Sequence, residues 1–560
     1  MEIPTETPRP AVESPLSTAR SFAVTPIAAL FAAVAALYVG TTGALPLLGK
    51  DEPRYVEVAR EMWVRGDWVT PTLGGHTWFE KPALLYWMII ASFSAFGVSE
   101  WAARLGPALC GVATVALCYW VTRRVERTTD SDVTGLALWS TAAVASSAGL
   151  IAFSHGATFD IVLTATVTLA LCCFFVAELE STPQKRRWAI AGLWAGAGLS
   201  LMAKGLVGLI LPGGVIFLYF ALRREWRGLL RLQIIWGLPL AIAVSALWYG
   251  PVIARHDGAF IDEFFVKHHF ARYFTNEYLH KQPVYYYGIV VPLLALPWTA
   301  FLVCALREAT PAAWRAEDAM ARLRVFALAW FMMPVAFFSL SGSKLAGYVL
   351  PAMPGAMLLV GISLAAYVRG ATGMGRARVS GALLMALGVG VLIYATRSRA
   401  VSLPQGIVVA VPLAAAGTVA FMMARRRALC ASLIAGAMFI ATGLLTSGII
   451  APPSKRASMR ELLRSATARG YGQTPVWQMN TLQRSAEFYA ADRLLYDADG
   501  EPVVFRVEAK IARALPRNGA ALVLVPKAQV SRLTQSPLLR AERLDDNGAI
   551  AIVLVRPKNS

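Results

Sequence analysis

Long apolar stretches, separated by short polar segments, occupy most of the chain up to about residue 450. Many of them contain roughly 18 to 24 residues, which is long enough for a helix to cross a hydrocarbon core about 30 Å thick. Their repetition predicts an all-α, polytopic membrane domain. The stretches, about fourteen in number, cover residues 23–46, 83–98, 101–122, 133–153, 158–180, 188–202, 205–222, 233–253, 285–306, 323–341, 348–368, 379–396, 403–423 and 428–451.

Basic residues gather in short loops between these stretches, which is typical of the cytoplasmic side of a membrane. The basic loops all lie on the same side of the membrane if residues 83–122 cross it once and not twice. We assign that single crossing to residues 101–122. Residues 84–97 are about 14 in number, too few for a full span, and are interpreted as a juxtamembrane or re-entrant helix. The basic loops contain Arg123, Arg124 and Arg127; Lys185, Arg186 and Arg187; Arg223, Arg224 and Arg227; Arg376 and Arg378; Arg425, Arg426 and Arg427; and residues 307–324.

This topology contains about thirteen transmembrane helices and predicts three parts of the chain. Residues 1–21 form a polar cytoplasmic tail, and residues 22–451 form the transmembrane domain, with external loops at residues 47–100 and 254–284. Residues 452–560 form an external, soluble α/β domain. Its strand-like runs are residues 475–479, 521–525 and 549–555, its helical patterns are residues 458–469 and 504–515, and its turn signals are Asp499-Gly500 and Asn547-Gly548.

Composition supports the membrane interpretation. The 560 residues are 56% hydrophobic and 16% charged, which is too little polar surface to coat a soluble globule of this size. Much of the net charge of +19 lies in the short basic loops, so nucleic acid is not an expected partner. The six cysteines all lie in apolar stretches without CxxC spacing, so we expect neither structural disulfides nor a thiolate metal site.

The first external loop contains Asp51, Glu52 and Pro53 at the start of a predicted helix. Proline suits the first turn of a helix, and an acid beside it can cap the free N–H groups. Capping and catalysis are therefore both open for the two acids. The helix is predicted to be amphipathic and to lie on the membrane surface. Its apolar face carries Tyr55, Ala59 and Met62, and another face carries Arg54, Glu57 and Glu61.

Several ionisable residues lie beside or inside apolar segments. Lys81 follows Glu80 where an apolar segment begins, a place where lysine commonly extends its ammonium toward the membrane interface. Asp160, Lys204 and Lys344 lie in or between apolar segments, where a charge is costly without a partner. Such residues are functional candidates by default.

The second external loop offers a weak signal for a metal. Two adjacent histidines on a helix, His268 and His269, diverge by about 100° and would not readily bind one metal ion together. A divalent cation, zinc or magnesium, would instead use one of them with a residue from elsewhere, such as Glu80. No cofactor is required by the sequence.

Seven motifs follow one another along residues 40–354: DEPRYVEVAREM, GDWVTP, FEKPALLYW, LSLMAKGLVG, FFVKHHFARYF, Leu296-Pro297-Trp298 and SGSKLAGYVLPAMP. In this order they resemble the polyprenyl-phosphate-dependent glycosyltransferases of the GT-C fold. The resemblance is strongest to the bacterial lipid A 4-amino-4-deoxy-L-arabinose transferases, which use undecaprenyl phosphate as the sugar carrier. Two departures are Ala83, where the family usually has a second proline, and Lys267, where an acidic residue is common.

The resemblance implies a role for individual residues. It implies that Asp51 and Asp160 are the catalytic acids, and that basic residues hold the substrate phosphates. On this basis the residues expected to bind substrate are Glu52, Arg54, Tyr55, Glu80, Lys81, Tyr86, Lys204, Arg272, Ser343, Lys344 and Tyr348.

The resemblance also implies a reaction and a location. The expected activity is transfer of 4-amino-4-deoxy-L-arabinose from undecaprenyl phosphate to a phosphate of lipid A, on the periplasmic face of the bacterial inner membrane. Such a modification of lipopolysaccharide confers resistance to polymyxin and other cationic peptides. The expected partners are the carrier-linked donor, the lipid A acceptor and membrane lipid, and the protein is expected to be a monomer.

Two alternatives remain open from the sequence. A related transferase could mannosylate protein or modify another envelope glycan. A transporter of lipid-linked substrates also contains intramembrane charges and broken helices. The chain shows no internal repeat, and its charged motifs lie on one membrane face instead of at the midplane, which favours the enzyme.

Overall fold

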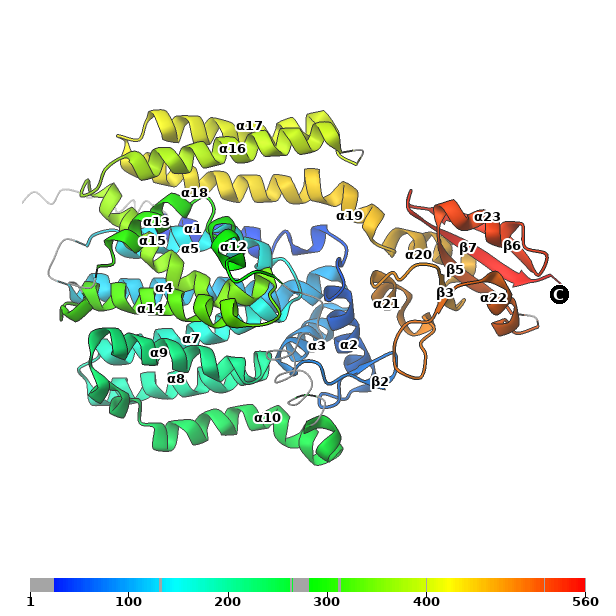
Figure 1. Ribbon diagram of the computed structural model, residues 1–560, viewed down its shortest axis with the longest axis horizontal. Coiled ribbons are helices and arrows are strands. Elements are labelled where there is room, and N and C mark those ends of the chain that lie inside the picture. Colours follow the sequence, from blue (N-terminus) through cyan, green and yellow to red (C-terminus); the bar gives the residue numbers. More distant parts are fainter. Residues whose placement is uncertain are drawn as a thin grey trace, which may run out of the picture.

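The computed structural model describes residues 25–129, 133–261, 264, 282–310, 314–398, 400–517 and 519–558. Roughly parallel helices form an elongated bundle, and a small α/β domain lies at one end of it (Figure 1). The predicted polar tail, residues 1–21, lies outside the described residues.

In the described part of the chain, nine helices are long and apolar enough to cross a membrane. The number rises to eleven if two bent pairs each form one span: α5 (Leu136–Ala145) with α6 (Ala148–Ser154), and α12 (Tyr286–Leu294) with α13 (Thr299–Glu308). The nine contain α1 (Pro26–Tyr38), α4 (Glu100–Thr128), α7 (Phe159–Leu179), α10 (Ile234–Ile261), α14 (Ala319–Leu340), α15 (Met353–Val368) after η5 (Ala346–Ala352), α16 (Gly375–Arg397), α17 (Leu403–Met422) and α18 (Arg427–Leu444).

Two further helices belong to the same bundle. Helix α8 (Pro183–Lys204) packs between α7 and α10, and α9 (Val207–Arg223) packs against α14. With these two, the arrangement agrees with the prediction of about thirteen membrane helices.

Helix α3 (Leu84–Phe96) is 13 residues long. At 1.5 Å per residue it extends roughly 20 Å, which is short of a hydrocarbon core of about 30 Å. It packs against α2 (Glu52–Arg65) and α4 at the end of the bundle that faces the α/β domain (Figure 1). This length and place agree with the prediction of a juxtamembrane helix.

The carboxy-terminal domain is built on a five-stranded sheet in the order β4-β3-β5-β7-β6. Strands β4 (Val504–Phe505), β3 (Val476–Met479) and β5 (Ala521–Pro526) are parallel, whereas β7 (Ile550–Pro557) and β6 (Leu539–Asp546) are antiparallel to their neighbours. Both faces of β5 and β7 are buried, which explains their nearly continuous apolar sequences. The helices of the domain are α20 (Arg460–Ala466), α21 (Ser485–Ala490), α22 (Glu508–Ala514) and α23 (Val530–Thr534).

The predicted central strands and the Asn547-Gly548 turn are confirmed. Gly548 has a φ of 93°, which suits glycine, and the turn joins β6 to β7. Strand β6 was not predicted, because its sequence LRAERLDD is mostly polar, as is common for an edge strand that is covered on one face only.

Helix α2 differs from the predicted surface helix. Its apolar face packs into the bundle, as expected, but its polar face lies against α21 of the carboxy-terminal domain. Arg60 donates to the carbonyl of Phe488 at 3.4 Å, and Arg54 lies 4.0 Å from the carboxylate of Glu487. The polar residues of α2 therefore serve a contact within the protein.

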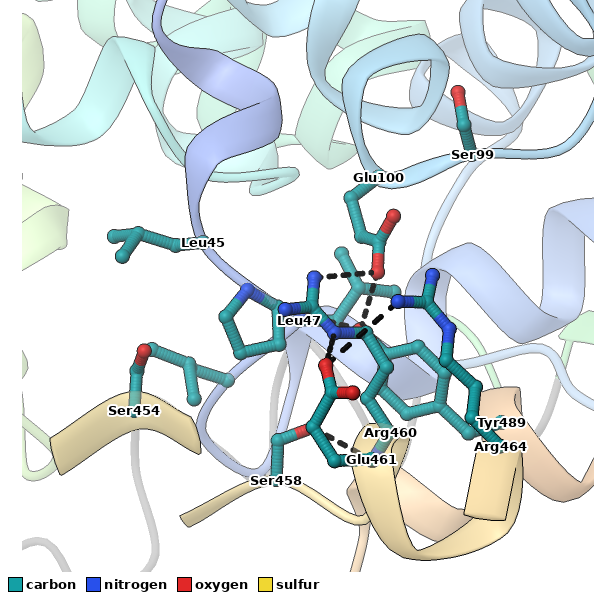
Figure 2. A network of polar contacts seen from close by, with 12 residues as sticks. Leu45, Leu47, Ser99, Glu100, Ser454, Ser458, Arg460, Glu461, Arg464 and Tyr489 are labelled. Atoms are coloured by element: carbon teal, nitrogen blue, oxygen red, sulfur yellow. Dashed lines mark hydrogen bonds and ion pairs between the residues drawn. The ribbon is translucent and has the colours of Figure 1, made fainter. Parts of the chain in front are cut away.

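A second junction lies at the amino-terminal end of α4. Glu100 accepts hydrogen bonds from Arg460 at 3.2 Å and from the hydroxyl of Tyr489 at 3.0 Å; the three side chains are drawn in Figure 2. The same hydroxyl accepts the backbone N–H of Leu47 at 2.9 Å. The carboxy-terminal domain thereby holds the segment that leads into Asp51.

Candidate active site

A cavity of about 150 Å³ opens beside the amino-terminal end of α2, and we call it the reaction cavity. Segments far apart in the sequence meet there: the start of α2, residues 80–82, the start of α7, the loop between α8 and α9, and residues 337–348. Its lining residues are Asp51, Tyr55, Glu80, Lys81, Pro82, Thr158, Phe159, Asp160, Lys204, Val207, Phe337, Phe338, Ser341, Ser343, Leu345 and Tyr348.

Asp51 precedes α2 and is exposed. It occupies the capping position of the helix, but its side chain makes no capping hydrogen bond. Of the two roles left open for Asp51 by the sequence, capping is therefore not the one this structure shows. Its carboxylate lines the cavity instead.

Glu52 is buried and does not line the reaction cavity. Its carboxylate forms a two-pronged ion pair with Arg104 at 2.7 and 2.8 Å, and accepts the N–H groups of Leu48 and Ala157 at 2.9 Å. The Arg104 guanidinium also donates to the carbonyls of Thr42, Leu45 and Pro46. Together, Glu52 and Arg104 fix the backbone on either side of the loop that ends at Asp51.

Glu80 and Lys81 form an ion pair at 2.9 Å on the cavity wall. They lie between the hairpin of β1 (Thr72–Leu73) and β2 (His76–Thr77) and the start of α3. Their side chains are 19% and 12% exposed, so an anion in the cavity could reach the ammonium of Lys81 in a site that is largely shielded from water.

Asp160 and Lys204 form the second ion pair of the cavity. Asp160 lies in the first turn of α7, and Lys204 is the last residue of α8. The Lys204 ammonium also lies 4.5 Å from the ring centre of Tyr348, close enough for an attractive cation–π contact. A side chain at position 347 would collide with the Asp160 carboxylate, so the glycine at this position allows the close approach.

The segment between α14 and η5 forms the opposite wall. Ser343 is buried, and within the described residues its hydroxyl has no hydrogen-bond partner. The ammonium of Lys344 is buried and donates to the carbonyl of Ser341 at 2.6 Å. Lys344 is not itself a lining residue, but its two neighbours Ser343 and Leu345 are.

One side of the cavity is apolar. Phe337 and Phe338 come from the end of α14, and Val207 is the first residue of α9. Both α14 and α9 are helices of the bundle. Acids and lysines therefore face a wall that continues into membrane helices. This arrangement suits a molecule with a charged head and a hydrocarbon tail.

Four predicted residues do not line the cavity: Glu52 and Lys344, both described above, together with Arg54 and Tyr86. Arg54 points toward the carboxy-terminal domain and lies over the ring of Trp78 at 4.3 Å. Tyr86 is fully buried against the ring of Phe159 at 5.4 Å. Arg272, His268 and His269 lie outside the described residues.

No group of three or more histidine, cysteine, aspartate or glutamate side chains suited to a metal occurs among the described residues. Glu80 does line the cavity, but His268 and His269, one of which was expected to join it, lie outside the described residues. The metal hypothesis stays untested.

Sequence reasoning did not select Arg104, Thr158 or Ser341. Arg104 interrupts an apolar stretch, and an intramembrane charge should have marked it as a residue with a partner. Thr158 and Ser341 carry no comparable signal, since serine and threonine are common in membrane helices.

A family model described as dolichyl-phosphate-mannose-protein mannosyltransferase matches residues 24–260. The chain is similar to the undecaprenyl phosphate-alpha-4-amino-4-deoxy-L-arabinose arabinosyl transferase of Edwardsiella ictaluri (strain 93-146), with 30% identity over 357 residues, 62% of this chain and 61% of the relative. The protein of the same name from Pseudomonas aeruginosa (strain LESB58) is 32% identical over 323 residues, 57% of this chain and 56% of the relative. The chain thus spans about three fifths of the length of these curated relatives.

Solved structures show the fold. The structure of ArnT from Cupriavidus metallidurans bound to undecaprenyl phosphate superposes with a TM-score of 0.76 at 21% identity, covering 94% of this chain and 97% of that one. The oligosaccharyltransferase AglB from Archaeoglobus fulgidus gives a TM-score of 0.52 at 12% identity, covering 90% and 69%. The predicted GT-C fold, with its small carboxy-terminal α/β domain, and the resemblance drawn from the motifs are confirmed.

Proposed function

We propose that the protein transfers 4-amino-4-deoxy-L-arabinose from undecaprenyl phosphate to a phosphate of lipid A. The observation that carries this proposal is the reaction cavity, in which two lysines and three carboxylates face a wall of apolar side chains. The names of the similar proteins supply the sugar and the carrier.

The charges of the cavity suit a phosphate leaving group. A polyprenyl phosphate leaves with negative charge, and fixed cations in a shielded site stabilise that charge as it develops. Lys81 and Lys204 line the cavity, whereas Arg54 does not. We therefore assign the carrier phosphate to Lys81 and Lys204, and the prenyl chain to the side formed by Val207, Phe337 and Phe338.

The role of Asp51 depends on the acceptor. A lipid A phosphate is already an anion and needs no base to remove a proton. In that reaction, the exposed carboxylate of Asp51 binds the ammonium of the aminosugar or orients the acceptor. Asp160 holds Lys204 in place as its ion-pair partner.

The decisive experiment combines the purified protein with the carrier-linked aminosugar and lipid A, followed by mass spectrometry of the lipid A. The expected result is a mass increase of one aminopentose residue, which requires both substrates and active protein. An unchanged lipid A mass, in conditions where a known transferase of this type works, would contradict the proposal.

A second candidate is a transferase that adds a sugar to protein, as the name of the matching family model indicates. A serine or threonine hydroxyl must lose its proton, so Asp51 would then act as a general base. The same reaction with protein in place of lipid A separates the two candidates.

The proposal includes a location and a physiological effect. The sugar acceptor would lie on the periplasmic side of the inner membrane, and the reaction cavity and the carboxy-terminal domain would face that side. Modified lipid A would carry less negative charge and bind cationic peptides such as polymyxin less tightly. The protein would act as a monomer without a required cofactor.

A further inference from the structure

A second cavity, of about 610 Å³, lies between α2, the β1–β2 hairpin and the carboxy-terminal domain. We call it the interdomain cavity. The proposed reaction assigns no role to it, although its volume falls in the usual range for small-molecule sites. Its lining residues are Glu57, Arg60, Glu61, Val64, Arg65, Gly74, Gly75, His76, Ala491, Asp492, Leu494 and Tyr496.

The walls of the interdomain cavity are firmly held. Glu61 accepts hydrogen bonds from the N–H groups of Gly74 and Gly75, at 2.6 and 3.2 Å, and from the hydroxyl of Thr72 at 2.6 Å. The hairpin turn lies against Tyr496, because a β-carbon at Gly74 would come within 2.5 Å of the tyrosine ring. The cavity is therefore part of the folded arrangement of the two domains.

Two buried polar atoms in its walls lack a partner among the described residues. Oε2 of Glu57 makes no hydrogen bond, although the Glu57 side chain is only 2% exposed, and neither does the hydroxyl of Tyr496. A buried polar atom without a partner is costly, so such atoms point to a ligand or to water.

The two arginines that line the cavity already have partners within the protein. Arg60 is paired with Oε1 of Glu57 at 2.5 Å, and Arg65 donates to the carbonyl of Thr70 at 2.7 Å and lies 3.8 Å from Asp67. Glu61 already accepts three hydrogen bonds from the hairpin. Among the described lining residues, the groups left to bind a ligand are hydrogen-bonding ones: Glu57 Oε2, the Tyr496 hydroxyl, and the exposed side chains of His76 and Asp492.

Such a set favours a neutral, hydroxyl-rich ligand over a phosphate. A phosphate site needs arginine or lysine with free donors. Hydroxyl groups both donate and accept, and they match carboxylate, phenol and imidazole groups spaced around a cavity.

The position of the cavity connects it to the reaction. One face of α2 lines the interdomain cavity with residues at three- and four-residue spacing: Glu57, Arg60, Glu61 and Val64. Another face carries Tyr55, which lines the reaction cavity. A helix is about 10 Å across, so an acceptor with two or more sugar rings is long enough to reach both faces of α2.

We propose that the interdomain cavity binds a saccharide part of the acceptor, through the Tyr496 hydroxyl and the free carboxylate oxygen of Glu57. This inference rests on the proposed function, because it takes the acceptor to be a glycolipid. Binding remote from the reacting phosphate would increase affinity for the acceptor and leave the donor unaffected.

The test uses the full-length protein with Tyr496→Phe and Glu57→Gln, which remove or alter one polar group each. Tyr471→Phe is the matched control, since Tyr471 lies in the same domain outside both cavities. The expected result is a KM for lipid A raised about 3- to 10-fold in each of the two variants, with the KM for the donor unchanged. An unchanged KM for lipid A in both variants, or an equal increase in Tyr471→Phe, would overturn the proposal.

A binding measurement separates this proposal from the proposed function. The probe is the deacylated sugar headgroup of lipid A, with and without its phosphates, and binding is followed by ligand-observed NMR. We expect both forms to bind the wild type and to lose affinity in Tyr496→Phe and Glu57→Gln. Binding of the phosphorylated form alone, or equal binding to wild type and variants, would overturn the saccharide site. Absence of sugar transfer with the binding pattern intact would instead refute the proposed reaction.

Discussion

The hydroxyl of Tyr489 lies 2.9 Å from the backbone nitrogen of Leu47, although the two residues are 442 positions apart in the chain. Leu47 lies four residues before Asp51, so a side chain of the carboxy-terminal domain directly holds the loop of the candidate acid. The same hydroxyl donates to Glu100, which Arg460 also binds (Figure 2). The domain is thus connected to the proposed chemistry and does not merely cover the end of the bundle.

Removing this hydroxyl should loosen the Asp51 loop. Tyr489→Phe is expected to lower kcat about 3- to 10-fold, the cost of losing the neutral hydrogen bond to Leu47, with little change in polyprenyl phosphate affinity. In an Asp51→Asn background the same substitution should cause no further loss, because Tyr489 acts through that loop. Full additivity of the two losses would show that Tyr489 acts elsewhere.

Asp51 is expected to be required for turnover and not for folding. Because its carboxylate is exposed in the cavity and makes no capping bond, Asp51→Asn should leave thermal stability unchanged and lower kcat/KM at least about 10²-fold. Asp499→Asn, at an exposed turn, is the control. Activity of Asp51→Asn within threefold of the wild type would remove Asp51 from the reaction.

The sequence predicted those parts of the fold that depend on local pattern. Apolar length identified the membrane helices and showed that residues 84–97 are too short to span, and the charge bias of the loops required a single crossing in residues 83–122. Strands β3, β5 and β7 were predicted because burial on both faces makes their sequences apolar, whereas the polar edge strand β6 was not. These features follow from hydrophobic burial, which a single sequence records directly.

The sequence could not show which polar residues face one another across the fold. Arg54 and Lys81 come from the same external loop and carry the same charge, yet Lys81 lines the cavity and Arg54 faces Glu487. Glu52 and Asp51 are adjacent, yet Glu52 pairs with Arg104 in α4. Tertiary contacts decide these cases, and no local pattern distinguishes them.

Lys81 is expected to bind the carrier phosphate. A charge-assisted hydrogen bond to phosphate contributes about 1.5 to 3 kcal/mol, so Lys81→Ala should weaken binding of polyprenyl phosphate about 10- to 100-fold. Arg54→Ala should leave this affinity nearly unchanged, because its guanidinium faces the carboxy-terminal domain. Lys510→Ala, at an exposed site, is the control. The reverse pattern, with loss only in Arg54→Ala, would move the carrier site to the domain junction.

Arg104 is expected to be essential for stability. Its side chain is 3% exposed, and it neutralises Glu52 while satisfying three backbone carbonyls. Arg104→Ala would leave a buried carboxylate unpaired, at a cost of about 3 to 5 kcal/mol. The check is thermal unfolding in detergent, and Glu52→Gln with Arg104→Met should recover part of the loss because no charge then stays buried alone. A melting temperature of Arg104→Ala equal to that of the wild type would show that the ion pair does not stabilise the loop.

The contact between α2 and the carboxy-terminal domain should weaken as pH rises. Burial raises the pKa of Glu57 to about 8, and the paired Arg60 offsets this only in part. Burial likewise raises the pKa of Glu487, which faces Arg54 and Arg484 across the same junction. An acid with a raised pKa keeps its proton in the folded state while the unfolded chain has lost it, so the folded state is favoured at low pH. For Glu57, that stability is lost between about pH 4.5, the ordinary value, and about pH 8.

Glu57→Gln removes this titration and keeps the side-chain volume. The melting temperature of the wild type is expected to fall as pH rises from 5 to 8, and the variant is expected to show a flatter profile over the same range. Glu461→Gln, at an exposed acid of the carboxy-terminal domain, is the control and should keep the slope of the wild type. Parallel profiles for wild type and Glu57→Gln would mean that Glu57 stays ionised with Arg60 throughout, and the junction would then be held by an ion pair at every pH.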